Sequence, residues 1–276
     1  MKLSIITVNL NNRDGFKKTA ESIISQTFKD YEWIVIDGGS TDGSKELIEK
    51  YANHITYWVS EPDKGIYNAM NKGIKVAKGD YLQFLNSGDI FINNHSLNSV
   101  HIERYDQDIV FATTVIFNGK MLKRINIQND YLTCYQLTKS TISHPSAFIK
   151  RDLFDRYGLY DESLKIVSDW KFFFNAIIIN KCSKKFVNQE IILFDTNGIS
   201  SSNGELRRKE REMVYNLYLP EYVRDDYMSR FELNELLDHR FSRAIIGFLY
   251  RTLIKLEKWK LLGLIVFAHY FSTYHI

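Results

Sequence analysis

The chain has 276 residues, 45% of them hydrophobic and 14% aromatic, so it is long enough to bury a substantial core. Its formal net charge of +3 is too small to indicate nucleic-acid binding, and we expect no nucleic-acid partner. Two widely separated cysteines, Cys134 and Cys182, argue against a disulfide framework or a cysteine-rich zinc site. The N-terminus begins with a strand pattern instead of a signal peptide, and no segment reaches the ~20 apolar residues of a membrane span. We therefore expect a cytoplasmic protein.

The first ninety residues alternate between strand and helix patterns. Strands are predicted at 3–8, 33–36, 55–59 and 81–85, and helices at 14–26, 44–51 and 65–77. This order predicts a parallel sheet with right-handed crossovers. Ser40, Thr41 and Asp42 are good N-cap types and are predicted to open the helix at 44–51.

The pattern changes after residue 108. Two apolar stretches at 109–117 and 121–127 flank the turn Asn118-Gly119 and predict a hairpin, so the sheet is expected to be mixed and mainly parallel. Further along we predict a strand at 146–149, a helix from 151, a longer helix after 168 and a strand at 191–194. From residue 205 the pattern is helical. The predicted organisation is an α/β domain over 1–204 with helices flanking the sheet, and a helical C-terminal extension over 205–276.

Three of the predicted strands end in short polar or acidic residues. The first runs into Asn9, the second into Asp37-Gly38-Gly39-Ser40, and the third into Asn86-Ser87-Gly88-Asp89. In open α/β sheets ligands bind beyond the carboxyl ends of the strands. The sequence therefore predicts a nucleotide-sized crevice with Asp37 and Asp89 as its fixed charges.

The two aspartates suggest different roles. Asp37 can accept the imide N–H of uracil, or a hydroxyl of a base or ribose; the alternative is an N-cap for the next helix. Asp89 ends a buried strand, where a carboxylate is costly unless a cation or several donors meet it. A divalent metal bridging two phosphates fits, because Mg²⁺ takes one or two protein carboxylates plus phosphate oxygens. The alternative for Asp89 is a turn-stabilising role.

Lys64 lies between these two positions, in a tight turn just before the helix at 65–77. Backbone N–H groups at a helix start, with an ammonium beside them, form a reasonable anion site. A solvated loop is the competing interpretation.

Taken together, these motifs are specific. The runs Ser4-Ile5-Ile6-Thr7-Val8-Asn9, Ile36-Asp37-Gly38-Gly39-Ser40-Thr41-Asp42-Gly43-Ser44, Glu61-Pro62-Asp63-Lys64-Gly65-Ile66-Tyr67 and Asn86-Ser87-Gly88-Asp89 resemble the family 2 glycosyltransferases. The chain is most similar to the non-processive bacterial enzymes of surface polysaccharide and glycolipid assembly, including the colanic-acid type. The resemblance covers residues 3–90, with a second stretch at 143–174.

The resemblance implies a GT-A fold, a nucleotide-sugar donor, a divalent metal (Mn²⁺ or Mg²⁺) and inversion at the anomeric carbon. Asp37 would meet the base, Asp89 the metal, and Asn9 would line the nucleoside pocket. The full set of expected nucleotide-binding residues is Val8, Asn9, Asp37, Gly39, Ser40, Lys64 and Ser87.

The sequence departs from the family at Gly88, where many members carry the first carboxylate of an Asp-x-Asp-like pair. A ribose or metal contact is thereby lost, so metal affinity is expected to be weaker or another ligand to help. His144, in Ser143-His144-Pro145-Ser146, is a candidate for that ligand. A structural histidine is the alternative.

Asp169 matches the position of the family's catalytic base, although many relatives have Glu-Asp where this chain has Ser168-Asp169. In an inverting transfer a carboxylate takes the proton of the attacking hydroxyl as the nucleotide leaves. The alternative for Asp169 is a helix cap, worth ~1 kcal/mol.

The C-terminal stretch over 241–272 mixes aromatic and basic residues at helical spacing. Such helices lie on anionic membranes, so we expect peripheral contact with the inner face of the cell membrane, where a polyprenyl-linked or glycan acceptor would be found. Packing against the catalytic core or another subunit is the alternative.

The sequence therefore predicts a metal-dependent inverting glycosyltransferase that uses a nucleotide sugar, with UDP favoured, in polysaccharide or glycolipid assembly. One rival is a sugar-phosphate nucleotidyltransferase, which would need a Gly-rich, basic loop after the first strand. Another is a catalytically degenerate assembly partner of a polysaccharide-synthesis complex, suggested by Gly88 and Ser168. The sequence does not specify the sugar, the acceptor, the linkage or the oligomeric state.

Overall fold

The computed structural model describes residues 2–117, 122–125, 130–196, 203–223, 225, 226 and 229. The chain divides into two compact units, Met1–Tyr218 and Leu219–Ile276, and the fold and site below belong to the first. Among the described residues no helix has the length and apolar character needed to cross a bilayer. The turn predicted at 118–119 and the membrane-contact segment predicted at 241–272 lie outside the described residues.

A nine-stranded sheet forms the centre of the first unit, with the strand order β3-β2-β1-β4-β8-β6-β9-β5 and β7 paired to β6. The parallel part contains β1 (Leu3–Asn9), β2 (Tyr31–Asp37), β3 (Tyr57–Ser60) and β4 (Tyr81–Phe84). The mixed part contains β5 (Ile90–Phe91), β6 (Ile109–Phe117), β7 (Leu122–Ile125), β8 (Ala147–Lys150) and β9 (Lys184–Phe194). The expected mixed, mainly parallel sheet is confirmed, including the β6–β7 hairpin.

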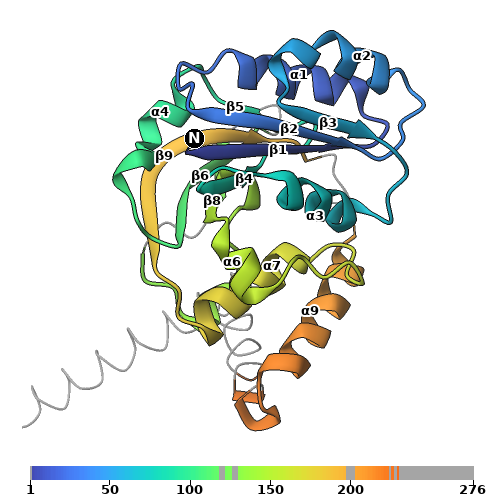
Figure 1. Ribbon diagram of the computed structural model, residues 1–276. Coiled ribbons are helices and arrows are strands. Elements are labelled where there is room, and N and C mark those ends of the chain that lie inside the picture. The colour runs from blue at the N-terminus through green and yellow to red at the C-terminus, as the bar shows by residue number, and fades with distance from the viewer. Residues whose placement is uncertain are drawn as a thin grey trace, which may run out of the picture. The chain divides into compact units, whose positions relative to one another are not determined.

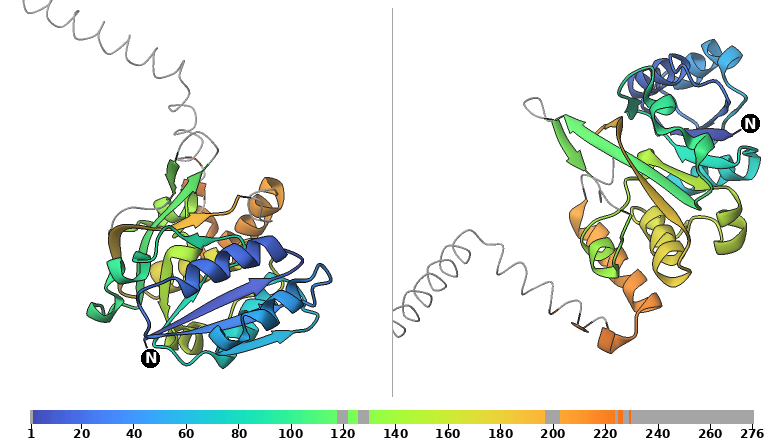
Figure 2. Two further views of the ribbon diagram at one scale, coloured as in Figure 1. Left: turned by 90° about the horizontal axis from the view of Figure 1, so that it is seen from above. Right: turned by 90° about the vertical axis from the view of Figure 1, so that its left-hand side faces the viewer.

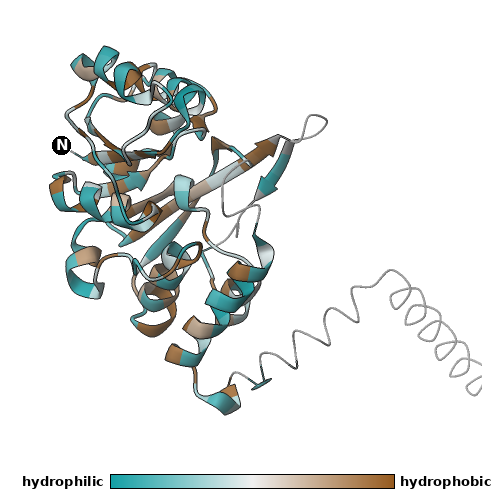
Figure 3. Cartoon of the chain, turned by 90° about the vertical axis from the view of Figure 1, so that its right-hand side faces the viewer, coloured by the Kyte–Doolittle hydropathy of each residue, from teal (hydrophilic) through white to brown (hydrophobic). Residues whose placement is uncertain are grey.

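Helices cover both faces of the sheet, which explains why its central strands are apolar along their whole length. Figure 1 shows α1 (Arg13–Ile24) and α2 (Ser44–Lys50) on one face, and α3 (Ile66–Val76), α6 (Asp152–Tyr157) and α7 (Ser168–Phe174) on the other. In the hydropathy view of Figure 3 hydrophobic residues run along the strands, whereas α1 and α2 carry many hydrophilic ones. Glycine at residue 73 lets α3 approach β1 closely, since a Cβ there would lie 2.5 Å from Ile6 Cγ2.

Local sequence explains the first helices, with one correction. Asn12 caps α1 by accepting the N–H of Gly15, and Phe16 of α1 stacks on Trp33 of β2 with ring centroids 6.0 Å apart. The N-cap of α2 is Gly43, so the prediction that Ser40, Thr41 and Asp42 open this helix was wrong in position. Gly43 takes a left-handed backbone with φ 86°, and Asp42 Oδ1 accepts the N–H and the hydroxyl of Ser44 from just outside the helix.

The chain after residue 89 holds elements that the sequence did not reveal. These are β5, the short helices α4 (Ser96–Val100) and α5 (Cys134–Lys139), and the first seven residues of β9, which was predicted only at 191–194. β9 begins at Lys184 because it pairs in parallel with β6 from Ile109 onward, a long-range contact with no local signature. Figure 2 shows β6 and β9 running side by side through the sheet.

The helix α9 (Gly204–Tyr218) packs within the first unit, which therefore extends beyond residue 204. Tyr215 of α9 meets the indole of Trp170 on α7 edge-on, with ring centroids 5.2 Å apart. α7 itself continues into a π-helical turn at Asn175–Ile179.

The strand directions place many chain segments at one edge of the sheet. β1 to β4 are parallel, β8 is antiparallel to β4 and to β6, and β9 is parallel to β6. The carboxyl ends of β1, β2, β3, β4, β6 and β9 therefore share an edge with the amino end of β8. That edge holds the candidate site.

Candidate active site

Asp37 lies at the centre of the strand ends and is fully buried. The parallel registers set Asn9 of β1 and Ser60 of β3 beside it on either side. Asn9 Nδ2 donates to Asp37 Oδ1 at 2.7 Å, and Ser60 Oγ donates to Oδ2 at 2.6 Å. Three more donors come from the next turn: the Ser40 hydroxyl at 2.6 Å, the Ser40 N–H at 2.9 Å and the Gly39 N–H at 3.2 Å.

These five bonds decide the charge of Asp37. Burial opposes ionisation, but the hydrogen bonds from Ser40, Ser60 and Asn9 outweigh it and lower the pKa of Asp37 below its ordinary value. A carboxylate has about four lone-pair sites, so all of them are engaged. Asp37 can therefore meet a base only if one of its hydroxyl donors turns away, and it also fixes the 38–41 loop. Ser60 was missed in the sequence, although it follows an apolar strand just as Asn9 does.

The loops after β1 and β2 are joined by side chains. Asn11 N–H donates to Ser40 Oγ at 2.8 Å, and Asn11 Oδ1 accepts the Thr41 N–H at 2.9 Å. Asn11 has φ 48°, a left-handed conformation that asparagine tolerates better than most residues. The predicted nucleotide-binding residues Asn9, Asp37, Gly39 and Ser40 are thus brought into one cluster.

Three buried oxygen atoms at this edge have no hydrogen-bond partner among the described residues: Asn9 Oδ1, Asn86 Oδ1 and Ser87 Oγ. Ser87 also donates its N–H to the Val8 carbonyl at 3.2 Å, which places both predicted residues at the strand ends. Buried polar atoms are nearly always paired, so a group of unpaired ones marks a place where a ligand supplies the partners.

Asp89 follows β4 at the end of a turn that Thr19 of α1 holds in place, because the Thr19 hydroxyl donates to the Asp89 carbonyl at 2.8 Å. The Asp89 carboxylate is only 4% exposed. Burial raises its pKa to about 7, an effect to which the charge of Asp195 adds and which the Asp195 N–H opposes by donating to Oδ1 at 2.9 Å. A buried carboxylate with one hydrogen bond and an acidic neighbour is stabilised by a cation.

The Asp89 carboxylate, with the unpaired oxygens of Asn86 and Ser87 on the same turn, fits a divalent metal ion such as Mg²⁺ or Mn²⁺. Within the described ranges no group of three or more His, Cys, Asp and Glu side chains is arranged to hold a metal ion. An ion at Asp89 would therefore complete its coordination with phosphate oxygens and water, as Mg²⁺ commonly does.

Lys64 lies exposed at the turn before α3. The turn is fixed by Asp63, whose Oδ1 accepts the Gly65 N–H at 2.8 Å, and by Asn68, whose Oδ1 accepts the Lys64 N–H at 3.2 Å. Asp63 also reaches the loop after β2, because its Oδ2 lies 2.5 Å from the place of a Cβ on Gly38. The predicted anion site thus adjoins the loop that Asp37 holds.

Asp169 is half-buried in the first turn of α7. The N-cap of α7 is Val167, and the Asp169 carboxylate is instead bound by Tyr67 of α3, whose hydroxyl donates to Oδ1 at 2.8 Å. Helix capping therefore does not account for Asp169. Its second oxygen accepts no hydrogen bond from the described residues, which leaves it available to a substrate hydroxyl.

The approach to Asp169 is fixed by Glu210 of α9, which sequence reasoning missed. The Glu210 carboxylate is 5% exposed and accepts three successive backbone N–H groups, those of Lys165 at 2.6 Å, Ile166 at 2.9 Å and Val167 at 3.2 Å. A glutamate in a helix rich in Arg and Lys gives no signal of burial in the sequence.

His144 is buried in an aromatic group instead of lying open to a phosphate. Its Nε2 is 2.8 Å from the Tyr160 hydroxyl, and its ring stacks on Phe84 with centroids 4.7 Å apart. Burial lowers the pKa of His144, and the charge of Asp169 works against that effect. The geometry favours a structural role for His144 near Asp169 over the role of a metal ligand, because His144 Nε2 is already hydrogen-bonded to Tyr160.

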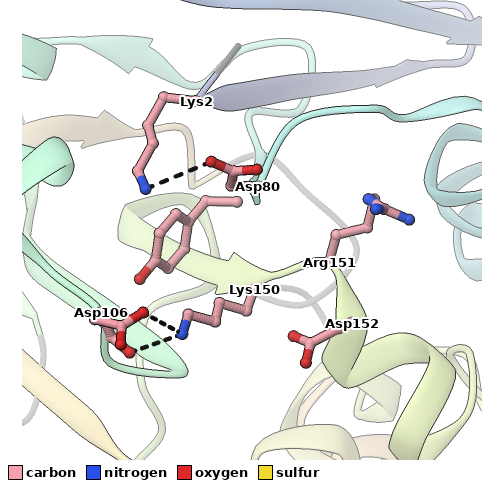
Figure 4. Close-up of a pocket in the computed structure, with 7 residues that line it drawn as sticks. Lys2, Asp80, Asp106, Lys150, Arg151 and Asp152 are labelled. Carbon is pink, nitrogen blue, oxygen red and sulfur yellow. Dashed lines mark hydrogen bonds and ion pairs between the residues drawn. The ribbon is translucent and has the colours of Figure 1, made fainter.

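A pocket of about 280 Å³ lies at the other edge of the sheet, around Tyr81 at the start of β4 (Figure 4). Its charges are largely paired, with Lys2 3.5 Å from Asp80 and Lys150 2.8 Å from Asp106. It is remote from the strand ends and holds none of the predicted site residues.

Comparison with known proteins agrees with this geometry. Residues 4–158 match the family described as Glycosyl transferase family 2. An uncharacterized glycosyltransferase of Mycobacterium tuberculosis is 30% identical over 229 residues, which cover 75% of this chain and 82% of the relative. The PGL/p-HBAD biosynthesis glycosyltransferase of Mycobacterium bovis is 29% identical over 175 residues, or 61% of this chain and 67% of the relative.

Two solved structures share the fold. The crystal structure of S. aureus TarS 1–349 in complex with UDP-GlcNAc has a TM-score of 0.64 at 22% identity and covers 88% of this chain and 74% of that one. The mannosyltransferase PcManGT from Pyrobaculum calidifontis, in complex with GDP-Man and Mn²⁺, has a TM-score of 0.57 at 12% identity and covers 99% of this chain and 87% of that one. The expected GT-A fold is thereby confirmed.

Proposed function

Because this chain belongs to glycosyl transferase family 2, we propose that it is an inverting enzyme that moves a sugar from a UDP-linked donor to an acceptor hydroxyl. The acceptor is a glycan or a polyprenyl-linked glycolipid in surface polysaccharide or glycolipid assembly. One observation carries the proposal: unpaired buried oxygens and two buried aspartates lie at the strand ends, near a half-buried carboxylate with one oxygen available. The choice of UDP is supported by a structural neighbour that holds UDP-GlcNAc.

The donor nucleotide would lie across the ends of β1, β2 and β4. Asp37 would accept an N–H of the base after one of its hydroxyl donors turns away. The Asn9 Oδ1 oxygen would accept a hydrogen bond from the nucleoside, and the Ser87 hydroxyl would donate or accept one. Lys64, exposed at the start of α3, would approach the diphosphate together with the N–H groups of that helix end.

A divalent metal, held by Asp89, would neutralise the charge that develops on the leaving diphosphate. The chain's own part is to keep Asp89 buried and in place, which the Thr19 hydroxyl and the Asp195 N–H do.

In the transfer the acceptor oxygen forms a bond to the anomeric carbon while the bond from that carbon to the phosphate oxygen breaks. The hydroxyl proton passes to Asp169 Oδ2, and the electron pair of the broken bond leaves with the nucleoside diphosphate. Tyr67 holds Oδ1 at 2.8 Å, so the carboxylate has one fixed oxygen and one reacting oxygen.

Binding tests the donor half of this proposal. We expect calorimetric titration of UDP with Mn²⁺ to give tighter binding than UDP alone, GDP or dTDP, and Asp89→Ala to abolish the gain from the metal. Asp80→Ala is the matched control, because Asp80 precedes β4 as Asp89 follows it, yet lies at the opposite edge of the sheet. Preference for GDP or dTDP would change the donor class, and no nucleotide binding would favour an assembly partner without activity.

Turnover tests the catalytic half. Release of UDP from UDP-GlcNAc and related donors in water, followed by nucleotide detection, needs no acceptor. We expect Asp169→Asn to lose most of this turnover and to keep UDP binding, while Asp155→Asn, an exposed aspartate of α6, behaves as wild type. Equal turnover in Asp169→Asn and wild type would remove Asp169 from the reaction.

A further inference from the structure

The turn before Asp89 lacks a side chain at residue 88, and another residue fills that place. Gly88 has φ 108°, and a Cβ built on it would lie 2.5 Å from Asp195 Oδ2 and 3.1 Å from Asp195 Cβ. Real Cβ atoms essentially never make contacts below 3.0 Å. The carboxylate of Asp195 therefore occupies the space into which a side chain of residue 88 would begin to extend.

The pairing of β5 with β9 explains this arrangement. The two strands are antiparallel, with Ile90 opposite Leu193 and Phe91 opposite Ile192. Continuing that register by two residues sets Gly88 opposite Asp195. The Asp195 N–H donates to Asp89 Oδ1 at 2.9 Å, so the backbone of one aspartate is tied to the carboxylate of the other.

The surroundings are those of an oxygen-lined cation site. Asp89 forms no ion pair with the described residues, and its Oδ2 accepts no hydrogen bond from them. On the same turn Asn86 Oδ1 and Ser87 Oγ are buried and find no partner in the part of the chain that the structure describes. Neighbouring carboxylates repel one another, and a cation bound between them would relieve that repulsion. Carboxylate oxygens are the ligands that Mg²⁺ and Mn²⁺ prefer.

We infer that Asp195 is the second carboxylate ligand of the divalent metal and replaces the acid that the sequence lacks at residue 88. The inference rests on the proposed function, since the metal is the one that the donor diphosphate requires. It assigns to the end of β9 the role that was expected of His144, whose Nε2 is held by Tyr160.

The two proposed protein ligands come from distant parts of the sheet. They follow the ends of β4 and β9, which are separated by β8 and β6 and are joined through the pairing of β5 with β9. Bound metal would therefore hold the end of β9 to the turn at residue 88.

The test is calorimetric titration of Mn²⁺ into the full-length protein with saturating UDP, with the free-Mn²⁺ electron paramagnetic resonance signal as a second readout. We expect Asp195→Asn, which keeps the backbone N–H and the size of the side chain, to weaken Mn²⁺ binding by at least about tenfold. UDP affinity without metal is expected to stay unchanged. Asp155→Asn is the control for loss of one negative charge.

A ligand substitution separates coordination from a purely electrostatic or structural role. Asp195→Cys places a softer ligand at the same position, so Zn²⁺ affinity should rise relative to Mn²⁺ in this variant and not in Asp195→Asn or wild type. Both wild-type cysteines are present in every variant, so their contribution cancels.

The outcomes distinguish this inference from the proposed function. Loss of Mn²⁺ affinity in both Asp89→Asn and Asp195→Asn, with the Zn²⁺ preference in Asp195→Cys, supports the inference. Loss in Asp89→Asn alone overturns it and leaves the proposed function intact. Absence of UDP-dependent Mn²⁺ binding by wild type overturns both.

Discussion

Replacing Glu210 tests most directly how the Asp169 loop, residues 165–167 just before α7, is held in place. In Glu210→Ala three backbone N–H groups lose their acceptor, those of Lys165, Ile166 and Val167. Lys165 is exposed, so water can replace the carboxylate there, whereas Ile166 and Val167 are buried at 6% and 2% exposure. Each buried donor left without a partner costs about 1–3 kcal/mol, so we expect a loss of about 2–6 kcal/mol in the free energy of unfolding.

Glu210→Gln should lower the free energy of unfolding by less than Glu210→Ala does, because an amide keeps one of the two accepting oxygens. Glu210 Oε1 accepts the Lys165 N–H and Oε2 accepts the other two, so the amide can retain either one bond or two. We expect a loss of about 1–3 kcal/mol, with the oxygen turned toward Ile166 and Val167. The order wild type, Gln, Ala is therefore part of the prediction.

Urea unfolding measures the stability, and donor hydrolysis with UDP titration measures the function. Because Asp169 follows Val167 by two residues, a loosened loop should lower kcat while the affinity for UDP stays unchanged. Glu212→Ala is the matched control, since Glu212 is exposed on the same helix and should change stability by no more than about 0.5 kcal/mol. If Glu210→Ala were as mild as Glu212→Ala, the carboxylate would not hold the loop and the reasoning would fail.

Three further substitutions address the charges of the site. Tyr67→Phe removes the donor that fixes Asp169 Oδ1, so kcat should fall while the affinity for UDP stays unchanged. Without metal, the stability of wild type relative to Asp89→Asn should fall as the pH rises from about 4 through 7, because the pKa of Asp89 is raised from 3.8 to about 7 in the folded state. Thermal unfolding of both proteins over this pH range measures the difference. Asp37→Asn should destabilise the protein by about 1–3 kcal/mol at pH 7, a difference that shrinks below pH 4 because the pKa of Asp37 is lowered by folding.

Two control variants come from the same chain. Tyr57→Phe removes an exposed hydroxyl and should leave kcat unchanged. Asp80→Asn removes an exposed aspartate and should leave the pH dependence of stability as in wild type. A kcat of Tyr67→Phe equal to that of wild type, or a stability difference between metal-free wild type and Asp89→Asn that stays constant from pH 4 to 7, would contradict the corresponding argument.

The site residues that could be predicted from the sequence share one property: each directly follows a strand whose neighbours in the sheet can be predicted. Asn9, Asp37 and Asp89 each follow an apolar strand in a β-α-β series, and such a series fixes which strands are neighbours and which ends meet. The same rule, applied to the strand at 191–194, would have pointed to Asp195. The direction of that strand is not evident from the sequence, because an apolar run does not show whether a strand of a mixed sheet is parallel to the others, and β9 owes its direction to β6.

Glu210 and His144 show a second limit of prediction from the sequence. Glu210 is surrounded in sequence by Arg and Lys, which is typical of a solvated helix face, yet tertiary packing buries it against backbone N–H groups 44 residues away at Ile166. His144 has the pattern of a ligand at a strand start, but the aromatic side chains of Phe84 and Tyr160 enclose it. Burial of single polar residues depends on contacts between distant segments, and local spacing carries no trace of those contacts.

The site therefore has two halves that differ in how they are built. The half expected to bind the donor comes from residues 3–89 and is held by hydrogen bonds among strand ends, as at Asp37. The half around Asp169 depends on α3 through Tyr67 and on α9 through Glu210, both long-range contacts. We therefore expect changes in α9 to alter turnover while leaving nucleotide affinity intact, and changes at Asp37 to alter nucleotide affinity first. Asp195, from the end of β9, is the exception, because it brings a distant strand into the donor half through the turn at Gly88.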